Sequence, residues 1–372
     1  MDKKNNRVII VDFNHMAHTY MNSGHRLTKT VKINGEQRFI DTTVQNGTIK
    51  CIHRWSRGGK YPTAVCFDSP VPSRKAYFAK MFDMGVEGDN AYKGSRAHMS
   101  NDMFEAITMV QELLVSSGVS CYKGENYEAD DLIFACIEKA KIDYPDYYID
   151  VITNDADLLP LVDDRVSVFL RSKKNTWAEF KEIEKLHYIQ VTPDNFQEVV
   201  EDLSSYRKFL VPYNSLLLHK LIRGDSSDNI SNDIKKLYPP KKWNMLIETM
   251  LNNGVDFSSL FRYGKCKEVY VSKTTGKVVD INTHDRSDIA IQYDDPDELT
   301  NMLDTLCWYI EEDEVLDYIA KMYRGMNLNQ AYTNLGSISR KPAKIKLPIV
   351  SFNETELQAK IKPLDINLKL FI

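Results

Sequence analysis

The chain has 372 residues, of which 43% are hydrophobic and 27% charged, a globular composition that excludes general disorder. Its formal net charge is −4 at pH 7, which fits a nucleic-acid binder only if many acids gather in one site and are neutralised there by cations. The six cysteines form no CxxC pair, which disfavours a zinc cluster, and no apolar stretch approaches the roughly 20 residues of a membrane span. We therefore expect a cytoplasmic protein without membrane contact.

Apolar runs in the first half of the chain predict buried strands at residues 8–11, 63–67 and 151–153, with a further strand at 165–170. Between them, residues 101–117 and 129–142 carry apolar side chains at helical spacing. Strands that alternate with helices predict an α/β fold, with a mainly parallel central sheet flanked by helices.

The pattern changes near residue 206. Helices are predicted at 213–223, 242–253, 297–311 and 313–325, and a β-hairpin at 269–282, with its turn at Thr275 and Gly276. From residue 327 the chain is rich in Asn, Ser, Lys and Pro, which is typical of a weakly structured tail. We predict an α/β domain over 1–205, a smaller helical subdomain with a hairpin insertion over 206–326, and a flexible C-terminal tail over 327–372.

Three of the predicted strands are followed by aspartates. Asp12 and Asp68 follow their strands directly, and Asp155 comes two residues after the third. Because the carboxyl ends of parallel strands share one edge of a sheet, these three side chains should converge there. A single Asp after a strand is commonly a turn former or a helix cap, but three of them with further acids nearby favour a shared site.

Glu128, Asp130 and Asp131 place three acids within four residues at a predicted helix start, where the helix dipole favours anions. A solvated acidic turn would explain them if polar residues followed. The apolar residues 132–134 follow instead, so the turn packs against the core. Clustered carboxylates at a core edge indicate hard cations such as Mg²⁺ or Mn²⁺.

Two more acidic pairs extend this set. Asp155 and Asp157 can point at one centre from a turn, and Asp225 and Asp228 can share one face of a helical turn after Gly224. So many carboxylates exceed what one ion needs and suit two cations that activate water and stabilise a leaving oxygen. The predicted metal-site acids are Asp12, Asp68, Glu128, Asp130, Asp131, Asp155, Asp157, Asp225 and Asp228.

A phosphate backbone can approach such a cluster only beside cationic residues. The run Tyr92-Lys93-Gly94-Ser95-Arg96 supplies a lysine point charge and an arginine fork, which suit a scissile phosphate, and Arg74 lies upstream on a possible entry path. The alternative for this run is a solvated basic loop. Lys93 and Arg96 are the predicted catalytic cations, and Arg74 and Tyr92 are predicted to contact the nucleic acid with them.

Taken in order, these motifs resemble the 5′ nuclease, or flap endonuclease, superfamily, which includes the 5′–3′ exonuclease domains of bacterial DNA polymerase I and the phage 5′–3′ exonucleases. The residues that carry the resemblance are Asp12, Asp68 in FD, YKGSR at 92–96, YEADD at 127–131, TNDAD at 153–157 and GDSSDN at 224–229. Their order and rough spacing match the family from residue 7 to about residue 230.

The resemblance implies a metal-dependent 5′–3′ exonuclease and flap endonuclease with two Mg²⁺ ions, for which Mn²⁺ can substitute. Its substrates would be DNA with 5′ ends, flaps or nicks, or RNA–DNA primer junctions, in replication or repair. The nine acids match the family's metal-site acids, Lys93 and Arg96 match the pair that engages the scissile phosphate, and the segment from Asp68 to about residue 100 matches the arch. A monomer in the cytoplasm of a bacterium or a phage-infected cell is expected.

The chain departs from the family after residue 229, where a Gly-rich helix–hairpin–helix segment usually grips duplex DNA. Here the sequence reads ISNDIKKLYPPKKW. Its lysines can still contact phosphates, and the predicted contacts are Lys235, Lys236, Lys241 and Lys242. An inactive protein that binds branched DNA and a PIN-like ribonuclease are the alternative functions. The intact acids disfavour the first, and the chain length with the YKGSR and GDSSDN blocks disfavours the second.

The last residues, 366–372, resemble the short Gln-Leu-x-Leu-Phe peptide by which bacterial replication proteins bind the sliding clamp, although Asn367 stands in place of Gln. Leu368, Leu370 and Phe371 would then be partner-binding residues. The alternative is a terminal strand docked on the protein's own core, or a frayed end.

Overall fold

The computed structural model describes residues 6–22, 27–33, 36–69, 99–124, 127–171, 188–203, 206–212, 215–224, 233–260, 268–280, 283–293, 296–326, 345, 347–364, 366 and 368. The chain divides into two compact units. Unit 1 comprises Met1–Pro70, Ala97–Thr192 and Ile345–Ile372, and unit 2 comprises Val71–Arg96 and Pro193–Lys344. This division differs from the predicted one, because the end of the expected tail belongs to unit 1.

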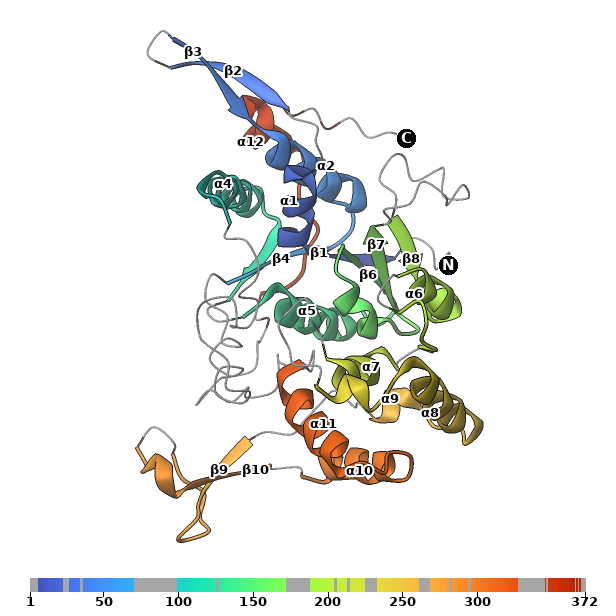
Figure 1. Cartoon of the computed structure of the whole chain (residues 1–372). Coiled ribbons are helices and arrows are strands. Elements are labelled where there is room, and N and C mark those ends of the chain that lie inside the picture. Colours follow the sequence, from blue (N-terminus) through green and yellow to red (C-terminus); the bar gives the residue numbers. More distant parts are fainter. Residues whose placement is uncertain are drawn as a thin grey trace. The chain divides into compact units, whose positions relative to one another are not determined.

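A six-stranded sheet forms the centre of unit 1, in the order β5-β4-β1-β6-β7-β8 (Figure 1). Its strands are β1 (Arg7–Asp12), β4 (Thr63–Phe67), β5 (Ser120–Lys123), β6 (Tyr148–Thr153), β7 (Val166–Arg171) and β8 (Tyr188–Val191). Neighbouring strands are parallel, except that β8 runs antiparallel to β7. The mainly parallel sheet expected from the sequence is confirmed.

Helices cover both faces of this sheet (Figure 1). The helices of unit 1 are α1 (Phe13–Met21), α2 (Thr43–Trp55), α4 (Asn101–Ser116), α5 (Ala129–Asp143) and α12 (Glu354–Ile361). Successive strand residues point to opposite faces. Ile9 and Val11 of β1 share a core with residues of α1, α2, α4 and α12, whereas Cys66 of β4 meets Cys136 of α5 on the other face, with the two Sγ atoms 3.8 Å apart. Burial on both faces explains why β1 and β4 are continuous apolar runs.

Residues 347–364 pack against unit 1, far from their neighbours in sequence. The backbone N–H of Thr63 donates to the carbonyl of Val350, and that of Phe352 donates to the carbonyl of Gly59, both at 3.1 Å. Gly59 has a φ of +84°, and a Cβ there would clash with the carbonyl oxygen of Phe352. Only glycine permits this close approach of the two segments.

The same segment completes the core of unit 1. Phe352, Leu357 and Ile361 are buried in the cluster that lies on the α1–α2–α4 face of the sheet. Glu354, at the start of α12, forms a 2.8 Å ion pair with His53 of α2, whose side chain is buried. This ordered segment differs from the flexible tail predicted there. Its buried residues Leu357 and Ile361 lie one helical turn apart, and the short helix α12 packs them against the core of unit 1.

Unit 2 is built mainly from helices. Its described elements are η4 (Pro193–Asn195), α6 (Phe196–Asp202), α7 (Leu216–Arg223), η6 (Asp233–Lys236), α8 (Pro240–Asn252), α9 (Phe257–Leu260), β9 (Glu268–Ser272), η7 (Arg286–Asp288), β10 (Ile289–Tyr293), α10 (Pro296–Cys307) and α11 (Asp313–Met326). Trp243 of α8 lies at the centre of its core, with Leu221 of α7, Leu306 of α10 and Ile319 of α11 around it. The described helices of both units include none that is long and apolar enough to cross a membrane.

Two β-hairpins differ from the sequence prediction. The expected turn at Gly276 is present, but β9 pairs with β10, with Val271 opposite Ala290, and residue 278 forms only a single bridge. A further hairpin, β2 (Thr28–Ile33) with β3 (Glu36–Asp41), was not predicted.

Phe352→Ala is expected to lower the free energy of unfolding of unit 1 by about 3 kcal/mol, because it leaves a cavity where the C-terminal segment meets the core. Hydrogen exchange of the amides of α12 and β4 would measure this loss. Leu347→Ala, at a side chain that is 68% exposed, is the matched control and should change stability by less than about 0.5 kcal/mol. Equal losses in the two variants would contradict the docking of this segment.

Acid should destabilise unit 2 through His219. Burial, helped by the charges of Arg223 and Lys220, lowers the pKa of His219 to about 3, and its ring packs against the rings of Phe209 and Trp243. An unfolded histidine takes up a proton near pH 6.5. Between about pH 6.5 and 3 the unfolded state therefore binds more protons, and stability falls with falling pH by up to about 1.4 kcal/mol per pH unit.

His219→Phe should flatten this pH dependence, since phenylalanine keeps a ring in place and cannot titrate. Urea unfolding of the wild type and the variant at about pH 7 and about pH 5 would test it. The same acid-induced loss in both proteins would show that another group is responsible.

Candidate functional site

The predicted strand-end acids lie at one edge of the sheet. β4, β1 and β6 are neighbours, with Asp12 opposite Cys66 in β4, and with residues 11 and 152 paired between β1 and β6. Asp12 is the last residue of β1, and Asp68 follows β4 directly. Asp155 comes two residues after the end of β6. The three acids therefore occupy the carboxyl ends of three adjacent parallel strands, where open sheets bind ligands.

Asp12 is completely buried at this edge. Its Oδ2 accepts a 2.7 Å hydrogen bond from the hydroxyl of Thr153, and its Oδ1 caps α1 by accepting from the backbone N–H of His15 at 3.4 Å. Burial raises the pKa of the Asp12 carboxyl, while His15 and Thr153 act in the opposite direction. The fold thus places a carboxyl where its charge calls for a cationic partner.

Thr153 connects two of the acids. Its hydroxyl donates to Asp12 and accepts a 2.9 Å hydrogen bond from the backbone N–H of Asp155. Asp155 in turn caps the 3₁₀ helix η2 (Ala156–Leu161), since its Oδ1 accepts from the N–H of Asp157 at 2.9 Å. The buried threonine at the end of β6 therefore sets the positions of both carboxylates. This role of Thr153 could not be recognised in the sequence, because threonine is common in strands.

His15 brings positive charge into the acidic cluster. Its Nε2 lies 3.1 Å from Oδ2 of Asp155. The charge of Asp12, together with Asp155 and Asp130, raises the pKa of His15 to about 10 against the effect of burial. An imidazolium thus offsets part of the repulsion among these acids. His15 was not among the predicted site residues, although its place three residues after Asp12 at a helix start indicates that the two side chains are close.

Asp68 is tied to the start of α5, the helix that carries the acidic motif. Its Oδ1 accepts a 2.7 Å hydrogen bond from the N–H of Ala129, and its own N–H donates to the side-chain oxygen of Asn14 at 3.3 Å. Glu128 and Asp131 form a capping box at the same helix start, in which Asp131 accepts from the N–H of Glu128 at 3.0 Å. Backbone N–H groups at the start of α5, which have no acceptor within the helix, thereby donate to the carboxylates of these acids.

These contacts assign different environments to the three acids of the α5 motif. Asp131 is fully buried and caps the helix, Glu128 is nearly as buried, and Asp130 is partly exposed. The charge of Asp130 also reaches His15, which places it on the side of the strand-end acids. Asp131 has a structural task that the sequence did not indicate.

The donor chemistry of this edge fits a hard divalent cation, because its acids offer carboxylate oxygens and no thiolate lies among them. Within the described ranges, no three His, Cys, Asp or Glu side chains are grouped closely enough to hold a metal ion. Asp225 and Asp228, the remaining predicted ligands, lie outside the described residues.

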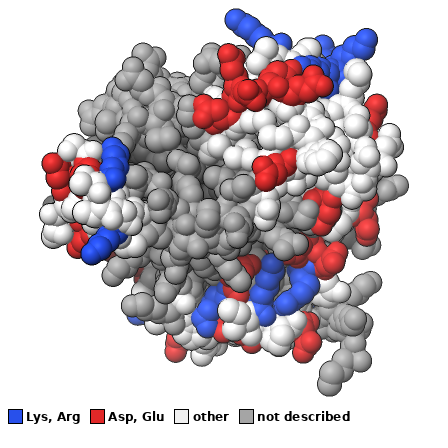
Figure 2. Space-filling model, turned by 90° about the horizontal axis from the view of Figure 1, so that it is seen from below, with Lys and Arg blue, Asp and Glu red and all other residues white. Residues whose placement is uncertain are grey.

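Several predicted nucleic-acid contacts also lie outside the described residues, namely Arg74, Tyr92, Lys93 and Arg96. The lysines of unit 2 are described: Lys235 and Lys236 end η6, and Lys241 and Lys242 open α8. All four lysines are exposed, and Lys242 also pairs with Glu312. Figure 2 shows Lys and Arg side chains of the described residues interspersed with Asp and Glu on the face it presents.

Two described residues of the predicted clamp-binding peptide are buried, whereas a peptide that binds a partner would be exposed. Ile366 and Leu368 are buried in the core cluster of unit 1, with 7% and 8% of their surface exposed. This placement matches the alternative of a terminal segment docked on the protein's own core. It argues against Leu368 as a partner-binding residue, since an anchor must be free to enter a pocket of the partner. Leu370 and Phe371 lie outside the described residues.

Residues 7–189 match a family model described as the 5′-3′ exonuclease, N-terminal resolvase-like domain. The chain is 32% identical over 138 residues to DNA polymerase I of Lactococcus lactis subsp. lactis (strain IL1403), a match that covers 37% of this chain and 14% of that protein. It is 34% identical over 139 residues to DNA polymerase I of Streptococcus pneumoniae (strain ATCC BAA-255 / R6), again covering 37% and 14%. The chain thus spans a small part of the length of these relatives.

Two solved structures are also similar. T5 5′-exonuclease with bound zinc gives a TM-score of 0.46 at 14% identity, over 87% of this chain and 87% of that chain. The catalytic core of Rad2 in complex with DNA substrate gives a TM-score of 0.39 at 14% identity, over 96% of this chain and 88% of that chain.

At the divalent-cation site that these acids would form, Thr153→Val should weaken the binding of Mg²⁺ by about 10- to 100-fold, because the hydroxyl that orients Asp12 and Asp155 is lost while the shape of the side chain is kept. Calorimetric titration of Mg²⁺ would measure the change. Thr63→Val is the matched control. Thr63 is equally buried but begins β4, so it lies at the end of that strand away from the carboxyl edge of the sheet. Unchanged Mg²⁺ affinity in Thr153→Val would remove Thr153 from the site.

Proposed function

Because residues 7–189 belong to the family of 5′-3′ exonuclease N-terminal domains, we propose that this protein hydrolyses phosphodiester bonds of DNA from 5′ ends and at 5′ flaps. Nicked duplexes and RNA–DNA primer junctions belong to the same substrate class. The observation that carries the proposal is the set of acids at the ends of three adjacent parallel strands, joined by the acidic start of α5. A nuclease of this kind serves replication or repair.

We propose that Mg²⁺ is the cofactor, with Mn²⁺ as a substitute, and that two ions are bound. The residues proposed to hold them are Asp12, Asp68, Glu128, Asp130, Asp155 and Asp157, and, among residues that the structure does not describe, Asp225 and Asp228. Two such ions supply an activated water and stabilise the leaving oxygen of the phosphodiester. Asp131 takes part indirectly, because its carboxylate fixes the start of α5.

The remaining residues of the edge hold this site in position. Thr153 orients Asp12 and Asp155, and the N–H of Ala129 fixes one oxygen of Asp68. His15 supplies a compensating charge beside Asp155, which reduces the repulsion that the acids exert on one another. Since each contact comes from a strand end or a helix start, the acids sit on rigid elements.

The phosphate of the substrate needs cations in addition to His15, which is already paired with Asp155. Lys93 and Arg96 are proposed to engage the scissile phosphate, and Arg74 and Tyr92 to contact the strand that leads to it. In unit 2, Lys235, Lys236 and Lys241 are exposed and suit contacts with duplex phosphates. Lys242 is a weaker candidate, because its charge is already paired with Glu312. The protein is proposed to act as a cytoplasmic monomer in a bacterium or a phage-infected cell.

Purified protein should cleave a labelled 5′-flap duplex, a nicked duplex or an RNA–DNA hybrid with Mg²⁺ and not with EDTA. Asp130→Ala and Asp155→Ala should each lower the cleavage rate by about two orders of magnitude or more. Asp143→Ala is the matched control, because Asp143 lies at the far end of the same helix in an exposed pair with Lys139.

The outcomes separate the possible functions. Magnesium-dependent cleavage that survives in Asp143→Ala and is lost in the other two variants supports the proposal. Binding of the flap without cleavage of any substrate would instead indicate an accessory protein for branched DNA. Cleavage restricted to single-stranded RNA would indicate a PIN-like ribonuclease.

Lys93→Ala should slow cleavage far more than it weakens substrate binding, because a cation at the scissile phosphate acts mainly on the charge that develops in the transition state. Single-turnover rates, compared with flap binding in the presence of Ca²⁺, would separate the two effects. Equal losses would assign Lys93 to binding of the ground state.

A further inference from the structure

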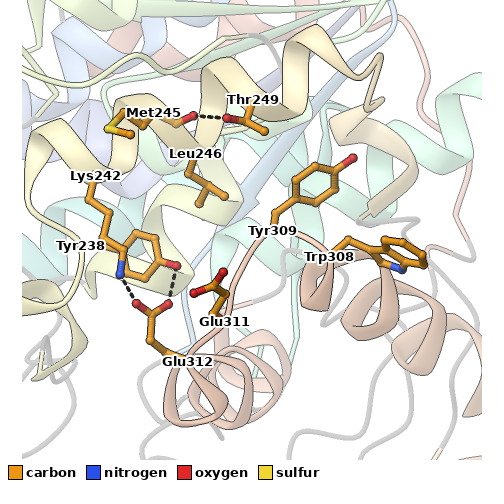
Figure 3. Close-up of a pocket in the computed structure, with 9 residues that line it drawn as sticks. All are labelled: Tyr238, Lys242, Met245, Leu246, Thr249, Trp308, Tyr309, Glu311 and Glu312. Atoms are coloured by element: carbon orange, nitrogen blue, oxygen red, sulfur yellow. Dashed lines mark hydrogen bonds and ion pairs between the residues drawn. The ribbon is translucent and has the colours of Figure 1, made fainter.

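A pocket of about 300 Å³ lies within unit 2, between α8 and the connection from α10 to α11 (Figure 3). It is lined by Tyr238, Lys242, Met245, Leu246, Thr249, Trp308, Tyr309, Glu311 and Glu312. Lys242, Met245, Leu246 and Thr249 come from α8, and the last four residues form the facing wall. None of them is an acid of the proposed catalytic edge.

One end of this pocket presents apolar surface to solvent. The indole of Trp308 is 85% exposed, and Met245 is 58% exposed on the opposite wall. No ring or cation contact engages Trp308 within the described part of the chain. An exposed tryptophan beside a concave surface with a polar rim is typical of a site that binds a partner.

The charges at the other end are not balanced. Glu312 accepts a 2.8 Å hydrogen bond from the hydroxyl of Tyr238 and pairs with Lys242, whose ammonium also lies 4.6 Å from the centre of the Tyr238 ring. Glu311 has no hydrogen bond or ion pair with any described residue, and Figure 3 shows its carboxylate directed between the walls. The pocket therefore holds one uncompensated negative charge.

We propose that this pocket binds a basic segment of a partner protein, in which an arginine or lysine meets Glu311 and stacks on Trp308. A neighbouring apolar side chain of the segment would cover Met245 and Tyr309. A cation over the face of tryptophan is attracted by the ring as well as by the carboxylate, and both groups become stronger binders once water is displaced.

The charge of the pocket selects a protein segment over a nucleic-acid strand. Bases stack well on tryptophan, but their phosphates would meet Glu311 and the exposed Asp313 and Glu314 at the start of α11. The cation that lines the pocket, Lys242, already serves Glu312. Trp308 and Glu311, the residues changed in the tests, are not among the proposed catalytic or nucleic-acid-binding residues, so the two proposals can be tested independently.

Calorimetric titration of the full chain with the amidated peptide Arg-Leu-Arg-Leu tests the proposal. The peptide should bind, with affinity that falls as salt is added, whereas Glu-Leu-Glu-Leu and oligothymidylate should not bind at Trp308. Trp308→Ala and Glu311→Gln should each weaken peptide binding by about five- to tenfold. The matched controls are Leu251→Ala and Glu314→Gln, which change an exposed leucine of α8 and an acid of α11 outside the pocket.

Three results would overturn the proposal. They are absence of peptide binding, peptide affinity that is the same in Trp308→Ala and Glu311→Gln as in the wild type, and oligothymidylate binding that is lost in Trp308→Ala. Thermal unfolding of each variant establishes that it is folded, and unchanged cleavage of a 5′-flap duplex establishes that the effect is confined to the pocket.

Discussion

The repulsion among carboxylates at one edge of a parallel sheet is the constraint on which the rest of the site depends. Each acid is held by a directional contact: the hydroxyl of Thr153 fixes Asp12, the N–H of Ala129 fixes Asp68, and the N–H of Asp157 fixes Asp155. These donors come from strand ends and helix starts, so the cost of keeping like charges together is met by the fold. Under the proposed function, these contacts would hold the acids in place for bound cations.

The sheet can carry such an edge because it is buried on both faces. Residues of β1 alternate between the core under α1, α2 and α4 and the core under α5, which leaves the strand ends as the place where polar groups emerge. The segment from residue 347 to α12 closes the first of these cores through Phe352 and the ion pair between Glu354 and His53. The rigidity of the acidic edge thus depends partly on residues from the other end of the chain.

Local patterns made part of this architecture predictable. Apolar runs that end in an acid gave β1, β4 and β6, and the periodic helices appear as α4, α5, α7, α8, α10 and α11. The positions of Asp12, Asp68 and Asp155 followed from the rule that parallel strands share a carboxyl edge. Thr153 and His15 were not predictable in the same way, because their roles arise from contacts between elements.

Long-range packing explains the other differences. The polar composition after residue 327 hides the short helix α12, whose buried Leu357 and Ile361 pack against a core formed by residues distant in the sequence. The capping role of Asp131 is hidden inside an acidic run that has the same composition as a ligand cluster. Pairing of β9 with β10 passes over the nearer run that contains Val278, which no local rule of turn chemistry anticipates.

The contact between Gly59 and Phe352 also sets an order in time. A ribosome makes β1, β4 and the acidic motif of α5 long before it makes residue 352, so the growing chain exposes the hydrophobic surface that Phe352 and Leu357 later cover. Closure of that contact joins residues separated by most of the chain, which makes it a slow and late event. The core beside the acidic edge therefore reaches its final packing only after residue 352 has been made, and an interrupted translation product that lacks this residue would display an open core.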